Sequence, residues 1–215
     1  MQRIPRKLDA VECRVLGALL EKEQATPEYY PMTIHALVAA CNQKNNREPV
    51  LELSEAEVEA ALHRLFEDVL VWRSEGARAL KWSHNLDRRW GLDAATRAVM
   101  TLLLLRGAQT AGELRGRSDR LHPFATVAEV EAALAALAAG DPAAGDQPLV
   151  AELARAPGQK ERRWVHLVGD APVAATEPAA RPGPGPAPRA ELDLRLAELE
   201  RRLERIERQL GLLSD

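Results

Sequence analysis

The chain contains an internal duplication, and this feature limits the possible folds more than any other. The sequence A-E-V-E-A-A-L occurs at residues 56–62 and again at 128–134. Three further blocks recur in the same order around it: L-D-A at 8–10 and 92–94, L-V at 70–71 and 149–150, and W-x-H at 82–84 and 164–166. Matching order over four blocks makes chance similarity implausible. The 215 residues therefore contain two copies of one structural unit, each about the size of a small domain.

Each copy predicts three helices followed by a hairpin. A side chain suited to a helix N-cap precedes every segment with apolar residues at helical spacing. These residues are Asp9, Thr33 and Ser54 in the first copy, and Asp93, Thr110 and Thr126 in the second. Two short runs around a Gly-containing turn then predict a β-hairpin, at 69–84 and at 149–168.

Three helices and a terminal hairpin is the element order of a winged helix-turn-helix domain. The sequence thus predicts a mainly α fold with small β-hairpin wings, arranged as two tandem winged helix-turn-helix domains. We expect the first domain at residues 8–90 and the second at residues 91–169.

A tail of different composition follows the duplication. Residues 170–190 are rich in Pro, Ala and Gly, which predicts a semi-stiff linker. In residues 191–213, apolar side chains alternate at steps of four and three, the pattern of a coiled-coil helix. They are Leu192, Leu196, Leu199, Leu203, Ile206, Leu210 and Leu213.

Charges beside these leucines favour a parallel pair of helices, because Arg195 would face Glu200 of a second copy and Arg202 would face Glu207. We therefore expect a homodimer. The alternative is a single amphipathic helix that packs on the chain's own domains.

Three segments resemble the YceH-like family of bacterial proteins. They are Cys41 to Val50 (C-N-Q-K-N-N-R-E-P-V), Leu104 to Arg115 (L-L-R-G-A-Q-T-A-G-E-L-R) and Pro157 to Glu161 (P-G-Q-K-E). The similarity extends over about residues 8–168. It implies a tandem winged-helix fold and no assigned activity.

The predicted third helices carry the wrong charge for reading DNA bases. Lys plus Arg number 29 against 32 Asp plus Glu, so the net charge is −3 and there is no overall basic field. The third helix of the first copy includes Glu55, Glu57 and Glu59, and that of the second copy includes Glu129 and Glu131. Phosphates would be repelled by both helices, so we do not expect base recognition through them.

Basic side chains lie instead after the second helices and in the wings. A surface of this kind could hold DNA by its phosphates without reading its sequence; the alternative is that these are solvated loop charges. The candidate phosphate contacts are Lys44, Arg47, Arg78, Lys81, Arg115, Arg117, Arg120, Lys160, Arg162 and Arg163. For the Asn-rich segment 42–46 within this set, a helix C-cap and turn is the alternative role.

The remaining residues with chemical potential favour structural roles. Cys13 and Cys41 are too far apart in sequence for a zinc or redox pair, and we expect buried thiols. Trp82 and Trp164 occupy strand positions, which favours packing over base stacking. For the His residues two positions after each Trp we expect packing or hydrogen bonding rather than metal binding.

No nucleotide, metalloprotease or hydrolase motif is present, so we expect no catalysis and no cofactor. No apolar run reaches the roughly 18 residues of a membrane span, and no signal peptide is evident. The expected location is cytoplasmic, with no membrane partner.

Two functions fit these observations. The first is a DNA-associated, regulator-like protein that grips duplex DNA through basic wings and loops. The second is a protein–protein interaction adaptor that uses the acidic third helices and the coiled coil. We rank DNA association first, by analogy with other winged-helix proteins.

Overall fold

A computed structural model describes residues 3–75, 79–140, 147–154 and 161–169. These residues belong to one compact unit, Met1–Ala174. The predicted linker (170–190) and coiled-coil helix (191–213) lie outside the described residues, as do Arg78 and Lys160.

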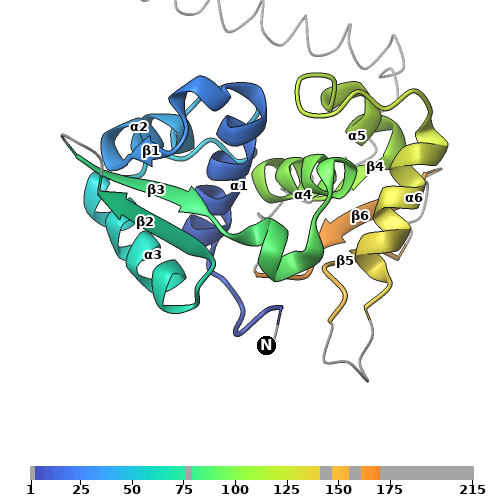
Figure 1. Cartoon of the computed structure of the whole chain (residues 1–215). Helices are drawn as coiled ribbons and strands as arrows, with labels where there is room; N and C mark the ends of the chain where they lie inside the picture. The colour runs from blue at the N-terminus through green and yellow to red at the C-terminus, as the bar shows by residue number, and fades with distance from the viewer. Residues whose placement is uncertain (1–2, 76–78, 141–146, 155–160, 170–215) are drawn as a thin grey trace, which may run out of the picture. The chain divides into compact units, whose positions relative to one another are not determined.

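The first half of the unit contains three helices and a small sheet (Figure 1). Its elements are α1 (Ala10–Ala25), η1 (Pro27–Tyr29), β1 (Met32–Thr33), α2 (Ile34–Cys41), α3 (Glu55–Glu67), β2 (Val71–Glu75) and β3 (Leu80–His84). The strands are antiparallel in the order β1-β3-β2, with Trp82 paired to Met32 on one side and to Arg73 on the other.

The second half repeats this order after a single π-helical turn, η2 (Asp87–Gly91). Its elements are α4 (Ala94–Arg106), β4 (Gln109–Thr110), α5 (Ala111–Arg117), α6 (Val127–Ala138), β5 (Val150–Glu152) and β6 (Arg163–His166). The strand order β4-β6-β5 is equivalent to that of the first half. The mainly helical fold with small antiparallel hairpins is confirmed, and its arrangement is winged-helix-like.

The sequence analysis did not predict β1 and β4. Each strand has two residues, too few for a periodic pattern, and each exists because β3 or β6 offers a free edge for pairing. The helix starts, in contrast, are where the sequence placed them. All six predicted N-cap side chains accept a hydrogen bond from the backbone of the first helical turn.

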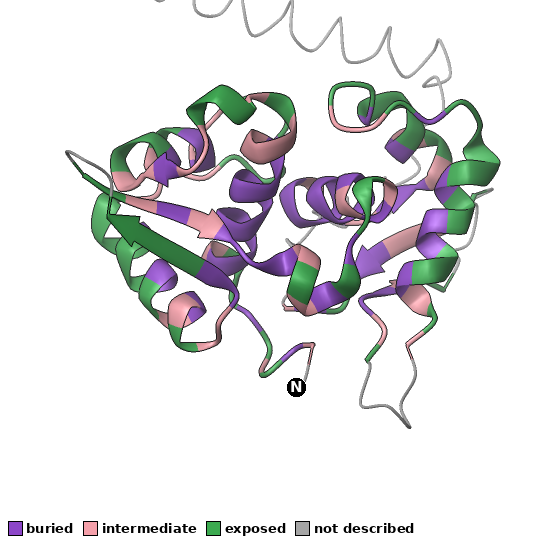
Figure 2. Cartoon of the chain, in the orientation of Figure 1, coloured by how far each residue is buried: buried purple, intermediate pink, exposed green. Residues whose placement is uncertain are grey.

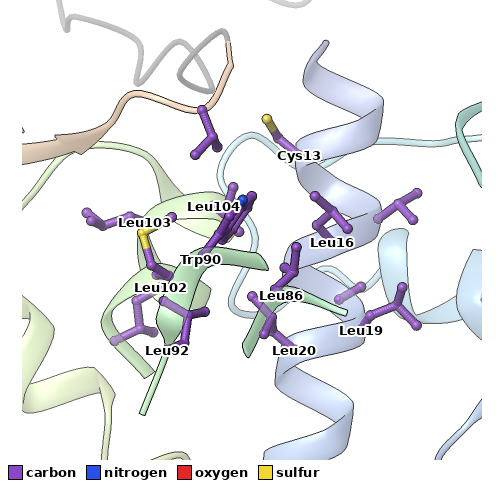
Figure 3. Close-up of a cluster of buried hydrophobic side chains, with 14 of the residues drawn as sticks. Cys13, Leu16, Leu19, Leu20, Leu86, Trp90, Leu92, Leu102, Leu103 and Leu104 are labelled. Carbon is purple, nitrogen blue, oxygen red and sulfur yellow. The ribbon is translucent and has the colours of Figure 1, made fainter. Parts of the chain in front are cut away.

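The core of the unit lies where α1 packs against α4. Most residues of both helices are buried (Figure 2). Figure 3 shows apolar side chains of both helices meeting those of the connection between the two halves. Those labelled are Cys13, Leu16, Leu19 and Leu20 of α1, Leu86, Trp90 and Leu92 of the connection, and Leu102, Leu103 and Leu104 of α4.

Gly17 allows α1 and α4 to approach closely. A Cβ atom at this position would lie 2.8 Å from Leu105 Cδ2 and 3.1 Å from Leu104 Cβ, so a larger residue would force the helices apart. The two halves therefore share one core.

The start of the first half is joined to the end of the second. The amide of Leu8 donates to the carbonyl oxygen of Val168 over 3.0 Å, and Leu8 forms a parallel bridge with Gly169. A side chain at Gly169 would collide with the carbonyl oxygen of Leu8 and with the sulfur of Cys13.

The residues expected to have structural roles are buried. Both cysteines are buried and free, and burial raises the pKa of the Cys41 thiol to about 12, which makes it unreactive. Trp82 is in the core, and Trp164 is half-buried against it. These expectations are confirmed.

The two equivalent His residues of the duplication, His84 and His166, differ in their environment. His84 Nε2 lies 2.7 Å from Glu23 Oε2, as a hydrogen-bonded histidine should. His166 is 2% exposed, and neither of its ring nitrogens has a partner among the described residues. Burial lowers the pKa of His166 to about 4, so this imidazole is neutral at pH 7.

Candidate nucleic-acid interface

A groove of about 1120 Å³ lies between the two halves. We call it the inter-repeat groove. It is lined by the end of α1, the loop after α2, the end of α4, and α5 with its following loop (Figure 1). The two loops that were predicted to be basic therefore line one common site, because the packing of α1 on α4 brings the two halves together.

The lining of the groove is predominantly cationic. Only two acidic residues line it, Glu21 and Asp119. The basic residues are Lys22, Lys44, Arg47, Arg106, Arg117 and Arg120. Four of the predicted phosphate contacts thus line the groove: Lys44, Arg47, Arg117 and Arg120.

Arg47 corrects the sequence-based prediction, because it is not available to phosphate. Its side chain is fully buried and forms a bidentate ion pair with Glu21, at 2.6 Å and 3.0 Å. The same guanidinium donates to the backbone carbonyl of Ala40. Its charge is therefore used to hold the loop after α2 on α1.

The Asn-rich segment forms the C-cap and turn that the sequence offered as its alternative role. The side chain of Asn42 exchanges two hydrogen bonds of 2.8 Å with the backbone of Leu53, and Asn46 adopts a left-handed φ of 61°. Asn46 Oδ1 also accepts a hydrogen bond of 2.6 Å from Arg106 Nη2. This contact joins the two halves across the groove.

Arg106 and Arg117 form the inner part of the groove and have mainly neutral partners. Arg117 Nη1 donates to Gln109 Oε1 at 2.7 Å, and its nearest carboxylate, Glu113, is 3.7 Å away. Burial, followed by repulsion from Arg117, lowers the pKa of Arg106. The two guanidinium groups are close enough to repel each other, and their short hydrogen bonds go to neutral amide oxygens.

Lys44 and Arg120 form the exposed rim of the groove. Neither of them has an ion pair within the part of the chain that the structure describes. Arg115, in contrast, lies beside the groove and donates to the carbonyls of Phe124 and Ala125, so it holds the loop before α6.

In the described part of the wings, two basic residues already have carboxylate partners. Arg162 pairs with Glu152 at 3.2 Å, and Arg163 pairs with Glu113 at 3.2 Å. Lys81 lies half-buried on β3 with no ion pair among the described residues. The exposed faces of α3 and α6 carry the acidic residues that the sequence placed there.

The sequence analysis missed Lys22 and Arg106, although the duplication contains a signal for them. Leu19 and Leu20 correspond to Leu103 and Leu104, and the same register aligns Lys22 with Arg106. A basic residue thus lies in the last turn of the first helix of both copies, where its charge interacts favourably with the helix dipole.

Other classes of site are not evident in the described ranges. No group of three or more His, Cys, Asp or Glu residues there could hold a metal ion. No helix among the described residues is long and apolar enough to cross a membrane.

Comparison with known proteins places the chain among uncharacterised bacterial proteins. The family described as "Protein of unknown function, DUF480" matches residues 8–159. A UPF0502 protein of Chromobacterium violaceum is 49% identical over 168 residues, which cover 77% of this chain and 74% of the relative. A UPF0502 protein of Geobacter metallireducens is 47% identical, with 90% of this chain and 84% of the relative covered. A further one from Azoarcus sp. is 46% identical, with 95% and 88% covered. With most of its length matched in this way, the chain belongs to the DUF480 family, whose curated relatives are UPF0502 proteins.

Proposed function

We propose that the chain is a non-enzymatic, DNA-associated protein with a tandem winged-helix fold of the YceH-like type. In this proposal it holds the phosphate backbone at the inter-repeat groove and does not read bases through α3 or α6. The observation that carries the proposal is the meeting of the basic loops of both halves at one groove, with six basic and two acidic lining residues.

Rim and inner residues of the groove have different roles in this proposal. Lys44 and Arg120 are exposed and can reach the backbone of a duplex that passes over the groove. Each contact of this kind releases condensed counterions, so it adds affinity without sequence specificity. The exposed acidic faces of α3 and α6 would be repelled by the same DNA.

Removal of the rim charges is expected to weaken DNA binding uniformly across sequences. We expect the double variant Lys44→Ala/Arg120→Ala to bind duplex DNA more weakly than the wild type. The slope of log affinity against log salt should decrease by about two, one for each lost phosphate contact. Titrations of a labelled duplex at a series of salt concentrations measure both quantities.

The matched control is Arg162→Ala, which removes a basic residue that already pairs with Glu152. It should leave the salt slope close to that of the wild type. Absence of binding by the wild type even at low salt would exclude DNA association.

The second candidate function is a protein–protein interaction adaptor, and one observation favours it. An apolar pocket of about 480 Å³ lies between α2, α3 and β3, with Leu80 and Trp82 in its wall and Glu59 at its edge. Leu80 is 42% exposed, so it offers apolar surface beside the pocket. A basic segment of a partner with an apolar anchor would match this surface, and failure of DNA binding would leave this function in first place.

We also propose that residues 191–213 form a parallel coiled coil that makes the protein a homodimer. Leu203→Glu should then convert the full chain from dimer to monomer, because the substitution places a charge in the apolar seam. Light scattering measures the mass. Ala197→Glu, outside the seam, is the control and should remain dimeric. A monomeric wild-type chain would contradict the dimer and favour the helix that packs on its own domains.

A further inference from the structure

The inner part of the inter-repeat groove concentrates positive charge. We call Lys22, Arg106 and Arg117 the groove floor. The side chains of Lys22 and Arg117 are 20% and 33% exposed. All three line the groove together with the buried Arg47. They come from the ends of α1, α4 and α5, so three separate elements direct cations into one volume.

Glu21 and Glu113 each lie closer to another cation than to a residue of the groove floor. Glu21 forms its short ion pair with Arg47 at 2.6 Å and lies 3.5 Å from Lys22. Glu113 is closer to Arg163, at 3.2 Å, than to Arg117, at 3.7 Å. Arg106 has no ion pair within the described residues, and its short hydrogen bond goes to the neutral amide oxygen of Asn46.

These neutral partners hold the cations in place without cancelling their charge. The bond from Arg106 to Asn46 and the bond from Arg117 to Gln109, at 2.6 Å and 2.7 Å, fix both guanidinium groups. Fixed cations in a partly buried site bind phosphate well, because guanidinium donates charge-assisted hydrogen bonds to phosphate oxygens and little ordering is needed on binding. Burial is the main cause of the lowered pKa of Arg106, and repulsion from Arg117 adds to it.

The groove also has an apolar side. Leu102, Leu105 and Leu121 line it beside the cations. Its volume of about 1120 Å³ is far more than one phosphate group occupies and is of the size that small-molecule ligands use. A ligand that combines a phosphate with a flat, weakly polar part matches both sides, and a nucleotide has this composition.

We infer that the groove floor is a binding site for a phosphate monoester of a nucleotide, held by Lys22, Arg106 and Arg117. The nucleotide is either free or the 5′-phosphorylated end of a nucleic acid strand. The inference concerns the floor of the groove and does not require that the rim binds duplex DNA.

Calorimetric titration with adenosine 5′-monophosphate and with adenosine, at constant ionic strength, tests the phosphate requirement. We expect the monophosphate to bind with a dissociation constant below about 1 mM and adenosine to bind at least about ten times more weakly. Arg106→Gln and Arg117→Gln should each weaken binding of the monophosphate about tenfold or more.

The rim variant Lys44→Ala/Arg120→Ala separates this inference from the proposed function. It should bind duplex DNA more weakly, while its affinity for the monophosphate stays within about threefold of the wild type. Arg162→Gln, outside the groove, should change neither. Thermal unfolding of each variant without ligand shows that a loss of affinity is not a loss of folding.

Oligonucleotides with and without a 5′-phosphate distinguish the two sources. Tighter binding of the phosphorylated strand, with no binding of the free monophosphate, assigns the site to strand ends. The inference is overturned if neither phosphorylated compound binds at about 10 mM, if adenosine binds equally well, or if the two floor variants bind like the wild type.

Discussion

Replacement of Arg47 by Met is expected to lower the free energy of unfolding by about 3–5 kcal/mol, the range for a buried ion pair that loses one partner. The side chain of Arg47 is fully buried and pairs with Glu21, whose side chain is only 12% exposed. The substitution would leave the Glu21 carboxylate without its short ion pair, with Lys22 at the longer distance of 3.5 Å. Chemical denaturation of the full chain measures the effect.

The double variant Glu21→Met/Arg47→Met is the matched control. It removes both charges and keeps apolar volume, so it should recover a large part of the lost stability. Arg162→Met breaks an exposed pair and should cost less than about 1 kcal/mol. Equal losses in the Arg47 and Arg162 variants would show that the Glu21–Arg47 pair does not support the loop after α2.

Acidification from pH 7 to pH 5 is expected to lower the free energy of unfolding by about 2 kcal/mol through His166 alone. Its pKa is about 4 in the folded protein and 6.5 without the fold, so the unfolded chain binds a proton more readily. The contribution of His166 to stability is therefore complete above about pH 6.5. This contribution is lost as the pH falls from there toward 4, where the total loss in the free energy of unfolding reaches about 3 kcal/mol.

Denaturation curves of His166→Leu and the wild type at both pH values measure this contribution. The variant should lose about 2 kcal/mol less than the wild type over the same interval. His63→Gln, which replaces an imidazole whose side chain is 60% exposed, is the control. A variant whose stability changes with pH as the wild type does would contradict a neutral, buried His166.

The duplication made much of the fold predictable. Repetition of local signals, such as the N-caps Asp9 and Asp93, identifies helix starts because a cap acts within one turn of the helix. The hairpins were predictable for the same reason, because a turn and the short apolar runs on either side of it are local signals. β1 and β4 could not be predicted, since two-residue strands depend on an edge that only the folded sheet provides.

The candidate site was predictable only in part. Lys44, Arg117 and Arg120 are in loops whose basic character is visible in the sequence, but their meeting depends on the packing of α1 on α4 around Gly17. The role of Arg47 was unpredictable from charge alone, because its partner Glu21 is on a helix 26 residues earlier in the chain. Charge patterns identify cations, and only tertiary contacts show which of them are already paired.

The bridge between Leu8 and Gly169 means that the order of the two halves along the chain is not what the fold requires. A short link from Gly169 to Leu8 would close residues 8–169 into a continuous loop. The chain could then be opened at an exposed turn within one of the halves, so that its first residue would lie elsewhere in the fold. Such a circular permutant would keep the α1–α4 core, both sheets and the groove between them.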